Sequence, residues 1–135
     1  MKHCACAKVQ KNIAYKTNRI SEYFNVNRVT WDQFYPSEKW MLERVAGPKG
    51  EMGRVLDVWC AAGGLGLALG GRFSLKEYVG IDINAPAIEC AEERRAGYAC
   101  PCRFIKGDVL GANALPDRKF DTVFSLSCAD WNIET

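Results

Sequence analysis

The most constraining feature of the sequence is a short apolar segment, residues 54–59, that runs directly into a turn of small residues, 60–64. An apolar run of this length before a glycine turn is typical of a buried strand. The run Leu65 to Leu69 that follows is apolar on nearly every side, as expected of a buried helix. Further strands are predicted at 77–82, 102–106 and 119–126, a helix from Asn84 to about Arg95, and a loop or irregular helix at 110–118. Strands that alternate with helices predict a parallel α/β sheet with right-handed crossovers.

The first third of the chain has a different character. Residues 1–54 carry 10 basic and 5 acidic side chains, whereas residues 55–135 carry 8 and 11. Glycine and proline at 47–50 mark a boundary, so we predict an N-terminal helical segment, 1–52, and a Rossmann-like domain, 53–135. A helix is expected to start with Ser37 as its N-cap and to turn Trp40, Met41, Leu42 and Val45 to one side.

Aromatic and basic side chains alternate before that helix, and they leave two interpretations open. They either cover one edge of the core or form a lid over a ligand. The aromatic residues are Tyr15, Tyr23, Phe24, Trp31, Phe34 and Tyr35, and the basic ones are Lys16, Arg19 and Arg28.

Composition excludes several classes of protein. The 135 residues carry 18 basic and 16 acidic side chains, a net charge of +2, which does not favour a nucleic-acid or membrane-surface protein. No apolar run approaches the roughly 18 residues of a membrane span, and no signal-peptide segment follows the start, so we expect a cytoplasmic protein. The seven cysteines include no Cys-x-x-Cys pair, so most are expected to be free thiols. His3, Cys4 and Cys6 lack a nearby fourth ligand, and no metal site is predicted.

Polar residues follow the predicted strands at the edge where α/β sheets bind ligands. The first strand contains Asp57 and leads into the small-residue turn, which leaves room for a ligand to approach backbone amides. The second strand ends in Asp82, whose carboxylate could accept two hydrogen bonds from ribose hydroxyls. The third is followed by Asp108, placed to accept from an adenine amino group. By contrast, Asp121 is predicted to be a surface charge.

These segments resemble the class I S-adenosylmethionine-dependent methyltransferases. Residues 55–64, 78–86, 104–108 and 120–124 are similar, in order and spacing, to four motifs of that family. The resemblance implies a strand order of 3-2-1-4 and S-adenosylmethionine as the cofactor. It also implies that Asp57 and the turn hold the methionine end, Asp82 the ribose and Asp108 the adenine. Further cofactor-binding positions would be Trp59, Cys60, Ala61, Gly63, Ile83 and Val109.

The sequence departs from the family pattern at two places. Trp59 stands where the family usually has glycine, so the indole has to fold away or occupy the cofactor's place. The chain also ends soon after the fourth strand, whereas family members generally continue through three more. We therefore expect an incomplete sheet, self-association through residues 120–126, and little methyl-transfer activity of the isolated chain.

Two other functions remain open. Ala61, Gly63 and Gly66 imitate a dinucleotide fingerprint, which would fit an NAD(P)- or FAD-binding Rossmann protein. A non-catalytic binding module, in which Trp59 plugs the site, is the other alternative.

No catalytic residue is assigned from the sequence. Cys102 is interpreted as a packing residue, and a small-molecule acceptor is preferred over nucleic acid. Candidates to face the acceptor are Ser127, Cys128, Asp130 and Trp131.

Overall fold

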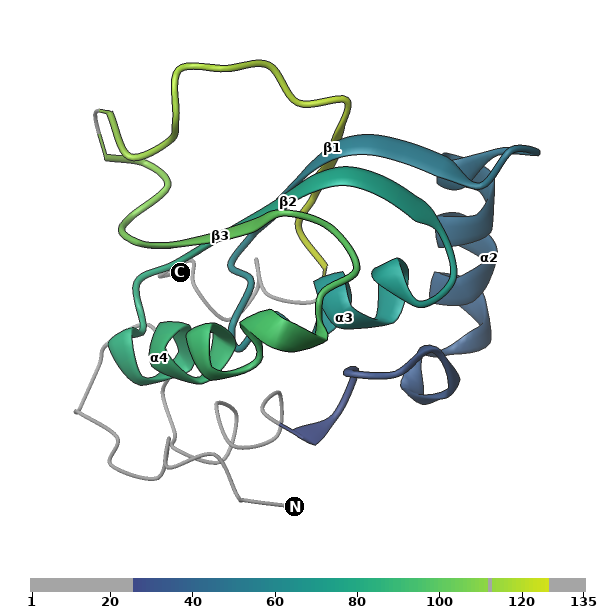
Figure 1. Ribbon diagram of the computed structural model, residues 1–135, viewed down its shortest axis with the longest axis horizontal. Coiled ribbons are helices and arrows are strands. Elements are labelled where there is room, and N and C mark those ends of the chain that lie inside the picture. Colours follow the sequence, from purple (N-terminus) through teal and green to yellow (C-terminus); the bar gives the residue numbers. More distant parts are fainter. Residues whose placement is uncertain (1–25, 112, 127–135) are drawn as a thin grey trace, which may run out of the picture.

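The chain folds around a four-stranded parallel sheet in the order β3-β2-β1-β4 (Figure 1). A computed structural model describes residues 26–111 and 113–126. The predicted α/β class and strand order are confirmed. The strands are β1 (Glu51–Val58), β2 (Ser74–Asp82), β3 (Cys102–Lys106) and β4 (Thr122–Phe124); the helices are α2 (Pro36–Ala46), α3 (Gly64–Gly70) and α4 (Ala85–Glu93), with 3-10 turns η1 (Trp31–Gln33) and η2 (Arg95–Gly97).

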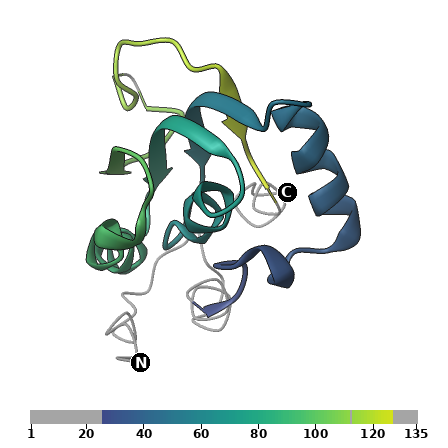
Figure 2. The same cartoon turned by 45° about the vertical axis from the view of Figure 1, so that its right-hand side comes forward.

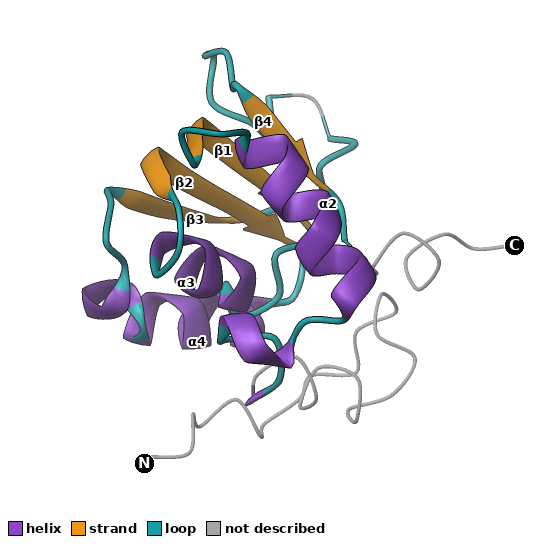
Figure 3. Cartoon of the chain, turned by 90° about the vertical axis from the view of Figure 1, so that its right-hand side faces the viewer, coloured by secondary structure: helices purple, strands orange, loops and turns teal. Residues whose placement is uncertain are grey.

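The sheet is covered differently on its two faces. The three α-helices lie on one face, and the long loop between β3 and β4 lies on the other (Figures 1 and 3). On the helix face, Leu42 of α2 and Leu69 of α3 pack with Val55 and Tyr78 of the sheet. On the loop face the buried residues are Leu56, Val79 and Ile81, covered by Val109, Ala114, Leu115 and Phe120. Neighbouring residues of β1 and β2 are therefore buried on opposite faces, which explains their continuous apolar runs.

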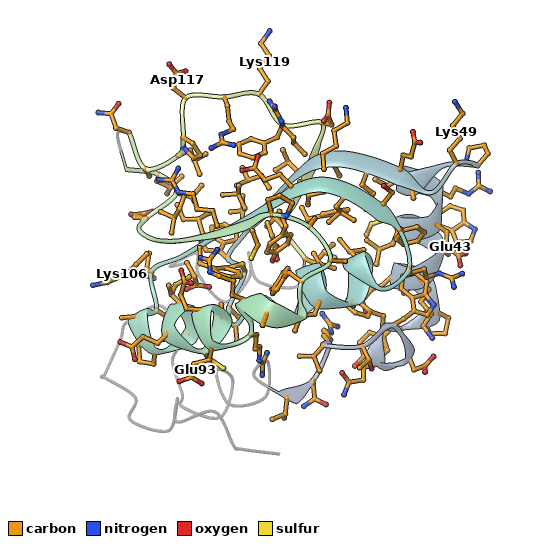
Figure 4. All side chains as sticks on the ribbon, viewed as in Figure 1. Glu43, Lys49, Glu93, Lys106, Asp117 and Lys119 are labelled. Atoms are coloured by element: carbon orange, nitrogen blue, oxygen red, sulfur yellow. The ribbon has the colours of Figure 1, made fainter. Side chains whose placement is uncertain are left out.

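Charged side chains lie at the margins of these layers. Glu43, Lys49, Glu93, Lys106, Asp117 and Lys119 are all exposed and point outward in Figure 4. None of the helices in the described ranges is long and apolar enough to cross a membrane.

The start of α2 corrects a prediction. The N-cap is Tyr35 and not Ser37, because Pro36 takes the first helical position, where its missing N–H costs nothing. The backbone N–H of Tyr35 donates to the Glu38 carboxylate, at 2.9 Å between N and Oε2. The predicted cap of α4 is confirmed, since the Asn84 side chain accepts from the N–H of Ala87 at 3.1 Å.

The buried side of α2 also differs from the prediction. Leu42 and Ala46, four residues apart, face the core, whereas Trp40 and Val45 are 60% and 44% exposed. The Arg44 guanidinium lies 4.5 Å from the centre of the Trp40 ring. The expected apolar side was wrong because Trp40 stacks with a cation at the surface, and alanine completes the buried row.

The fourth strand is shorter than the predicted segment 119–126 and spans only three residues. It pairs with β1 alone within the described ranges, and Val123 is 59% exposed. The boundary predicted at 52/53 falls inside β1, and α2 shares the helix-face core with the sheet. The division into a segment 1–52 and a domain 53–135, and the self-association through residues 120–126, stay predictions.

β1 contains a bulge near its start, at Gly53, and Asp121 bonds the backbone next to it. Gly53 has a φ of +69°, and the pairing with β2 shifts on both sides of it. The Asp121 carboxylate accepts from the N–H of Arg54 at 2.8 Å, and the N–H of Asp121 donates to the Arg54 carbonyl at 2.9 Å. Asp121, predicted to be a surface charge, is exposed but has a structural role in joining β4 to β1.

This bulge predicts a large effect of Gly53→Ala on stability. A methyl group there would clash with the Asp121 carboxylate, in addition to the backbone strain of a positive φ. Gly47→Ala is the matched control, because Gly47 also has a φ of +69° but has nothing within 4 Å of the added methyl. We expect Gly47→Ala to cost about 1–3 kcal/mol of unfolding free energy, because its φ of +69° and ψ of −172° lie in a region that only glycine adopts freely, and Gly53→Ala clearly more, measured by urea denaturation. Equal losses would show that Asp121 does not hold the bulge.

Candidate functional site

Four of the predicted site residues line one small cavity at the carboxyl end of β1. They are Asp57, Trp59, Cys60 and Ala61. The other lining residues are Asn27, Arg28, Phe34, Gly64, Leu65 and Leu126. The cavity has a volume of about 40 Å³, which is room for water but not for a nucleoside.

The turn between β1 and α3 has an unusual backbone. Trp59, Ala61 and Gly63 all have positive φ angles, of 60°, 48° and 74°. This is the left-handed region that glycine adopts freely and other residues adopt at a cost of about 1–2 kcal/mol each. A glycine at position 59, which the resemblance leads one to expect, would adopt this backbone freely, whereas Trp59 adopts it under strain.

Asp82 fixes that turn. The side chain is buried, and its Oδ2 accepts from the N–H of Ala61 at 2.9 Å. Its Oδ1 accepts from the N–H of Asn84, also at 2.9 Å. One carboxylate thus ties the glycine turn to the start of α4, next to the cavity and not facing bulk water.

Asp57 forms a second buried contact. It is 4% exposed, and its Oδ2 accepts a hydrogen bond from the hydroxyl of Tyr78, with 2.5 Å between the oxygens. Burial raises the pKa of the Asp57 carboxyl to about 7; the Tyr78 hydrogen bond opposes this rise and the Asp82 charge adds to it. A carboxyl with this pKa changes its charge near neutral pH, which is frequent at functional sites.

Tyr98 supports the turn from the side of α4. Its hydroxyl donates to the Gly63 carbonyl, and its ring lies 5.4 Å from the rings of both Tyr78 and Phe104. A side chain at Gly66 would lie within 2.7 Å of the Tyr78 and Tyr98 rings. The glycines of this region therefore serve close packing against tyrosines.

The chain just before η1 covers the cavity from outside. The Arg28 carbonyl comes so near to α3 that a methyl group on Gly64 would lie 2.6 Å from it. The Arg28 guanidinium pairs with Glu38 at 2.9 Å and lies 5.3 Å from the Tyr35 ring centre. In Figure 2 this segment passes beneath α3. Trp31 and Phe34 also pack on the core, so the core-edge interpretation is confirmed for them.

The remaining predicted residues lie apart from the cavity. Asp108 is exposed, and its carboxylate accepts from the N–H of Leu110 at 2.9 Å, which closes a turn after β3. Val109 packs on the loop face, and Ile83 is half-buried after β2. The structure therefore brings the β1 turn and Asp82 together. The predicted residues outside the cavity lining are Gly63, Asp82, Ile83, Asp108 and Val109, although Asp82 bonds the lining residue Ala61.

The cysteines and the acceptor-facing candidates complete the predicted set. Cys100 and Cys102 are free thiols, and both pack against the helix-face core. No group of three or more potential metal ligands occurs among residues 26–111 and 113–126. The candidates Ser127, Cys128, Asp130 and Trp131, and the group His3, Cys4 and Cys6, lie outside the described residues.

Sequence reasoning missed the two tyrosines. In the sequence Tyr78 counts only as one apolar position of a strand, and Tyr98 lies outside every predicted motif. A buried tyrosine needs a partner for its hydroxyl, and that requirement was the available signal for Tyr78. The approach of Tyr98 to the turn depends on the packing of α4 and had no signal in the sequence.

Comparison with known proteins identifies the family. A family model described as a methyltransferase domain matches residues 55–134, more than half of the chain. The chain belongs to the class I S-adenosylmethionine-dependent methyltransferases. The family that the resemblance suggested from the sequence is thereby confirmed.

Two individual proteins show how far this methyltransferase chain extends. Phosphoethanolamine N-methyltransferase 1 of Arabidopsis thaliana is 30% identical over 119 residues, which are 84% of this chain and 23% of that protein. The chain thus spans about a quarter of the length of that relative. The X-ray structure of YjhP from E. coli aligns with a TM-score of 0.51 and 19% identity over 75% of this chain and 42% of that one, which supports the fold alone.

The family implies S-adenosylmethionine, and the donor set of this site fits such a ligand. Asp57 provides a carboxylate for a cationic group at the cavity, Asp82 provides a second one next to the lining residue Ala61, and Gly64 of the turn lines the cavity without a side chain. The space does not fit it while Arg28 covers the turn, because ligand pockets of this kind measure about 300–1,000 Å³. Binding therefore requires the segment at Asn27 and Arg28 to shift.

The raised pKa of Asp57 predicts how stability depends on pH. The folded protein binds a proton that the unfolded chain releases between pH 4 and pH 7, so the free energy of unfolding falls as the pH rises through this window, by up to about 4 kcal/mol. In Asp57→Asn the side-chain carbonyl can still accept from Tyr78 without burying a charge. We expect this variant to lose most of the pH dependence and to exceed wild type in stability at pH 8, measured by urea denaturation at pH 5 and pH 8.

The control for this measurement is Asp117→Asn, which changes the same side chain at an exposed position. It should retain the wild-type pH dependence. A wild-type protein that is equally stable at pH 5 and pH 8 would contradict the assigned protonation of Asp57.

Proposed function

We propose that this protein is an S-adenosylmethionine-dependent methyltransferase domain that acts on a small-molecule acceptor. The observation that carries the proposal is the convergence of Asp57, Asp82 and the strained glycine turn at the carboxyl ends of β1 and β2. Open α/β sheets bind their ligands at this edge. Membership of the methyltransferase family supports the choice of cofactor.

Each carboxylate has a proposed role in holding the cofactor. Asp57 and the turn hold the methionine end, and Asp82 accepts hydrogen bonds from the ribose hydroxyls. Asp82 accepts the backbone N–H groups of Ala61 and Asn84 through its two oxygens, which holds its carboxylate beside the turn where the ribose is proposed to lie. Asp108 closes its own turn through Oδ1, which leaves Oδ2 to accept from the adenine amino group.

The sulfonium of the cofactor supplies an activated methyl group. The residues of this chain then have to bind, orient and exclude water, since alignment of the reacting groups carries most of such a reaction. Phe34, Trp59, Leu65 and Leu126 line the cavity with apolar surface, which serves the exclusion of water. The Arg28 to Glu38 ion pair keeps the covering segment in place.

The acceptor is proposed to be a small molecule that enters beside this apolar and basic rim. The plant relative acts on phosphoethanolamine by its name, so small phosphorylated amines are the first acceptors to test. The chain carries no continuous basic stripe, which argues against nucleic acid as the acceptor. We also propose a cytoplasmic location, since three of the four cysteines in the described ranges, Cys60, Cys100 and Cys102, are reduced, as is typical of a reducing compartment, whereas Cys90 is in a disulfide.

A non-catalytic module is the second candidate, and one observation favours it. The cavity is small because Arg28 lies over the turn and Trp59 lines its wall. Titration with S-adenosylmethionine, with NAD⁺ and with FAD separates the alternatives. Binding of the first alone supports the methyltransferase, binding of a dinucleotide supports the Rossmann alternative, and no binding supports the non-catalytic module.

Substitution of Asp82 tests the cofactor site. Asp82→Asn removes the charge that would accept the ribose hydroxyls, and a hydrogen bond to a charged group contributes about 1.5–3 kcal/mol. We expect the Kd for S-adenosylmethionine to rise at least tenfold in calorimetry, while Asp117→Asn leaves it unchanged. Thermal melting of both variants shows whether the turn stays folded. Equal affinities of folded Asp82→Asn and wild type would refute this site.

Replacement of Trp59 tests whether the indole blocks the cofactor. Trp59→Gly relieves a positive φ at a residue that lines the cavity, so it should both enlarge the cavity and remove about 1–2 kcal/mol of strain. We expect tighter binding of S-adenosylmethionine in the same calorimetric assay. Weaker binding would show that the indole packs against the cofactor and belongs to its site.

A further inference from the structure

The contact between Asp57 and Tyr78 has a geometric cause in the sheet. Asp57 of β1 pairs with Gly80 of β2, which has no side chain. Tyr78 lies two residues earlier on the same face of β2, and a long side chain at this diagonal position can reach across the strands. Its hydroxyl meets the Asp57 carboxylate at 2.5 Å, with Tyr78 fully buried.

The other hydroxyl in this cluster is already engaged elsewhere. Tyr98 donates to the Gly63 carbonyl, so Tyr78 is the donor that the described residues offer to Asp57. Asp57 is also one of the residues that line the cavity. One tyrosine thus holds the carboxyl group of a residue at the candidate site.

The charged and titratable groups around Asp57 come from several elements. Asp82 at the end of β2 disfavours a second negative charge, and the Arg28 guanidinium is held by Glu38. From α3, the cavity is lined by Gly64 and Leu65, and from the chain after β4 by Leu126. None of these three residues has a titratable side chain. Within the described part of the chain, the titratable groups at this site are Arg28, Cys60, Tyr78, Asp82 and Tyr98.

We propose that Tyr78 is a positioning residue for the cofactor, which orients and stabilises the ionised form of Asp57, and that binding of a cationic ligand releases the proton that Asp57 carries in the free protein. This inference rests on the proposed function. On binding, the protonated carboxyl gives its proton to solvent, and the resulting carboxylate pairs with the positive charge of the ligand.

The expected size of the effect follows from the protonation of Asp57. With a pKa of about 7, roughly half of the free protein carries the proton at pH 7. Binding of S-adenosylmethionine should then strengthen about tenfold between pH 6 and pH 8, because the ionised fraction rises by that factor. Removing the Tyr78 hydroxyl removes the interaction that favours the ionised form, so the Tyr78→Phe profile should shift to higher pH.

The test is isothermal titration calorimetry of S-adenosylmethionine without acceptor, at pH 6, 7 and 8, in two buffers of different ionisation enthalpy. Wild type should release about half a proton more at pH 7 than Asp57→Asn. Protons from the ligand's own amino group contribute equally to both titrations and therefore drop out of this difference. Tyr78→Phe should bind S-adenosylmethionine more weakly at pH 7 than wild type does. The midpoint of its affinity against pH should lie above pH 7, and it should release more protons per ligand bound at pH 7. Tyr98→Phe is the matched control, since it removes a hydroxyl of the same cluster that bonds a backbone carbonyl; its midpoint should equal that of wild type.

Four results would overturn the inference. Affinity of wild type that does not depend on pH, with the ligand bound, would refute the proton release and leave the proposed function intact. Equal shifts in Tyr78→Phe and Tyr98→Phe would show a general packing effect. Absence of binding at every pH would overturn the proposed function and the inference with it. The carboxyl carbon of Asp57, followed by NMR without ligand, should titrate near pH 7 in wild type and at higher pH in Tyr78→Phe, and equal midpoints there would also overturn it.

Discussion

The architecture of the site depends on one buried carboxylate. Asp82 ends β2, yet its two oxygens hold the N–H groups of Ala61, in the turn after β1, and of Asn84, at the start of α4. Two crossovers of the sheet are thereby fixed by one side chain. A buried charge is costly unless it is hydrogen-bonded in this way, so the same contacts that make Asp82 tolerable also make the turn rigid. The candidate site at the carboxyl ends of β1 and β2 depends on these contacts.

Asp57 shows the opposite solution to the same problem. It lies two residues before the turn and bonds one hydroxyl, from Tyr78, so burial is compensated only in part and its pKa rises to about 7. Complete compensation would lock the group in one charge state. Under the proposed role of Asp57, partial compensation leaves a carboxyl that a cationic ligand ionises, at the expense of stability above neutral pH.

The sequence predicted those features that depend on local pattern. The apolar runs and the turn of small residues predicted the strands, the family resemblance implied their order, and Asn84 was predicted as the cap of α4. The sequence did not predict features that depend on packing between distant segments of the chain. Trp40 was assigned to the core, but the surface stacking with Arg44 keeps it out, and β4 is limited to the three residues that pair with β1. At the site, the roles of Tyr98 and Arg28 depend on partners 35 and 36 residues away in the chain.

The strain in the turn and the cover over it are connected. Positive φ angles at Trp59 and Ala61 cost stability that glycine would save, and Gly64 is small because the Arg28 carbonyl approaches it. A turn held in a costly conformation by Asp82 is ready for a ligand without rearrangement, so a ligand has to displace only the covering segment. The ion pair of Arg28 with Glu38 is mostly removed from water and therefore holds this segment more firmly than a surface pair would. For the proposed cofactor, the binding free energy would be that of its own interactions with the site, reduced by the free energy needed to displace the covering segment.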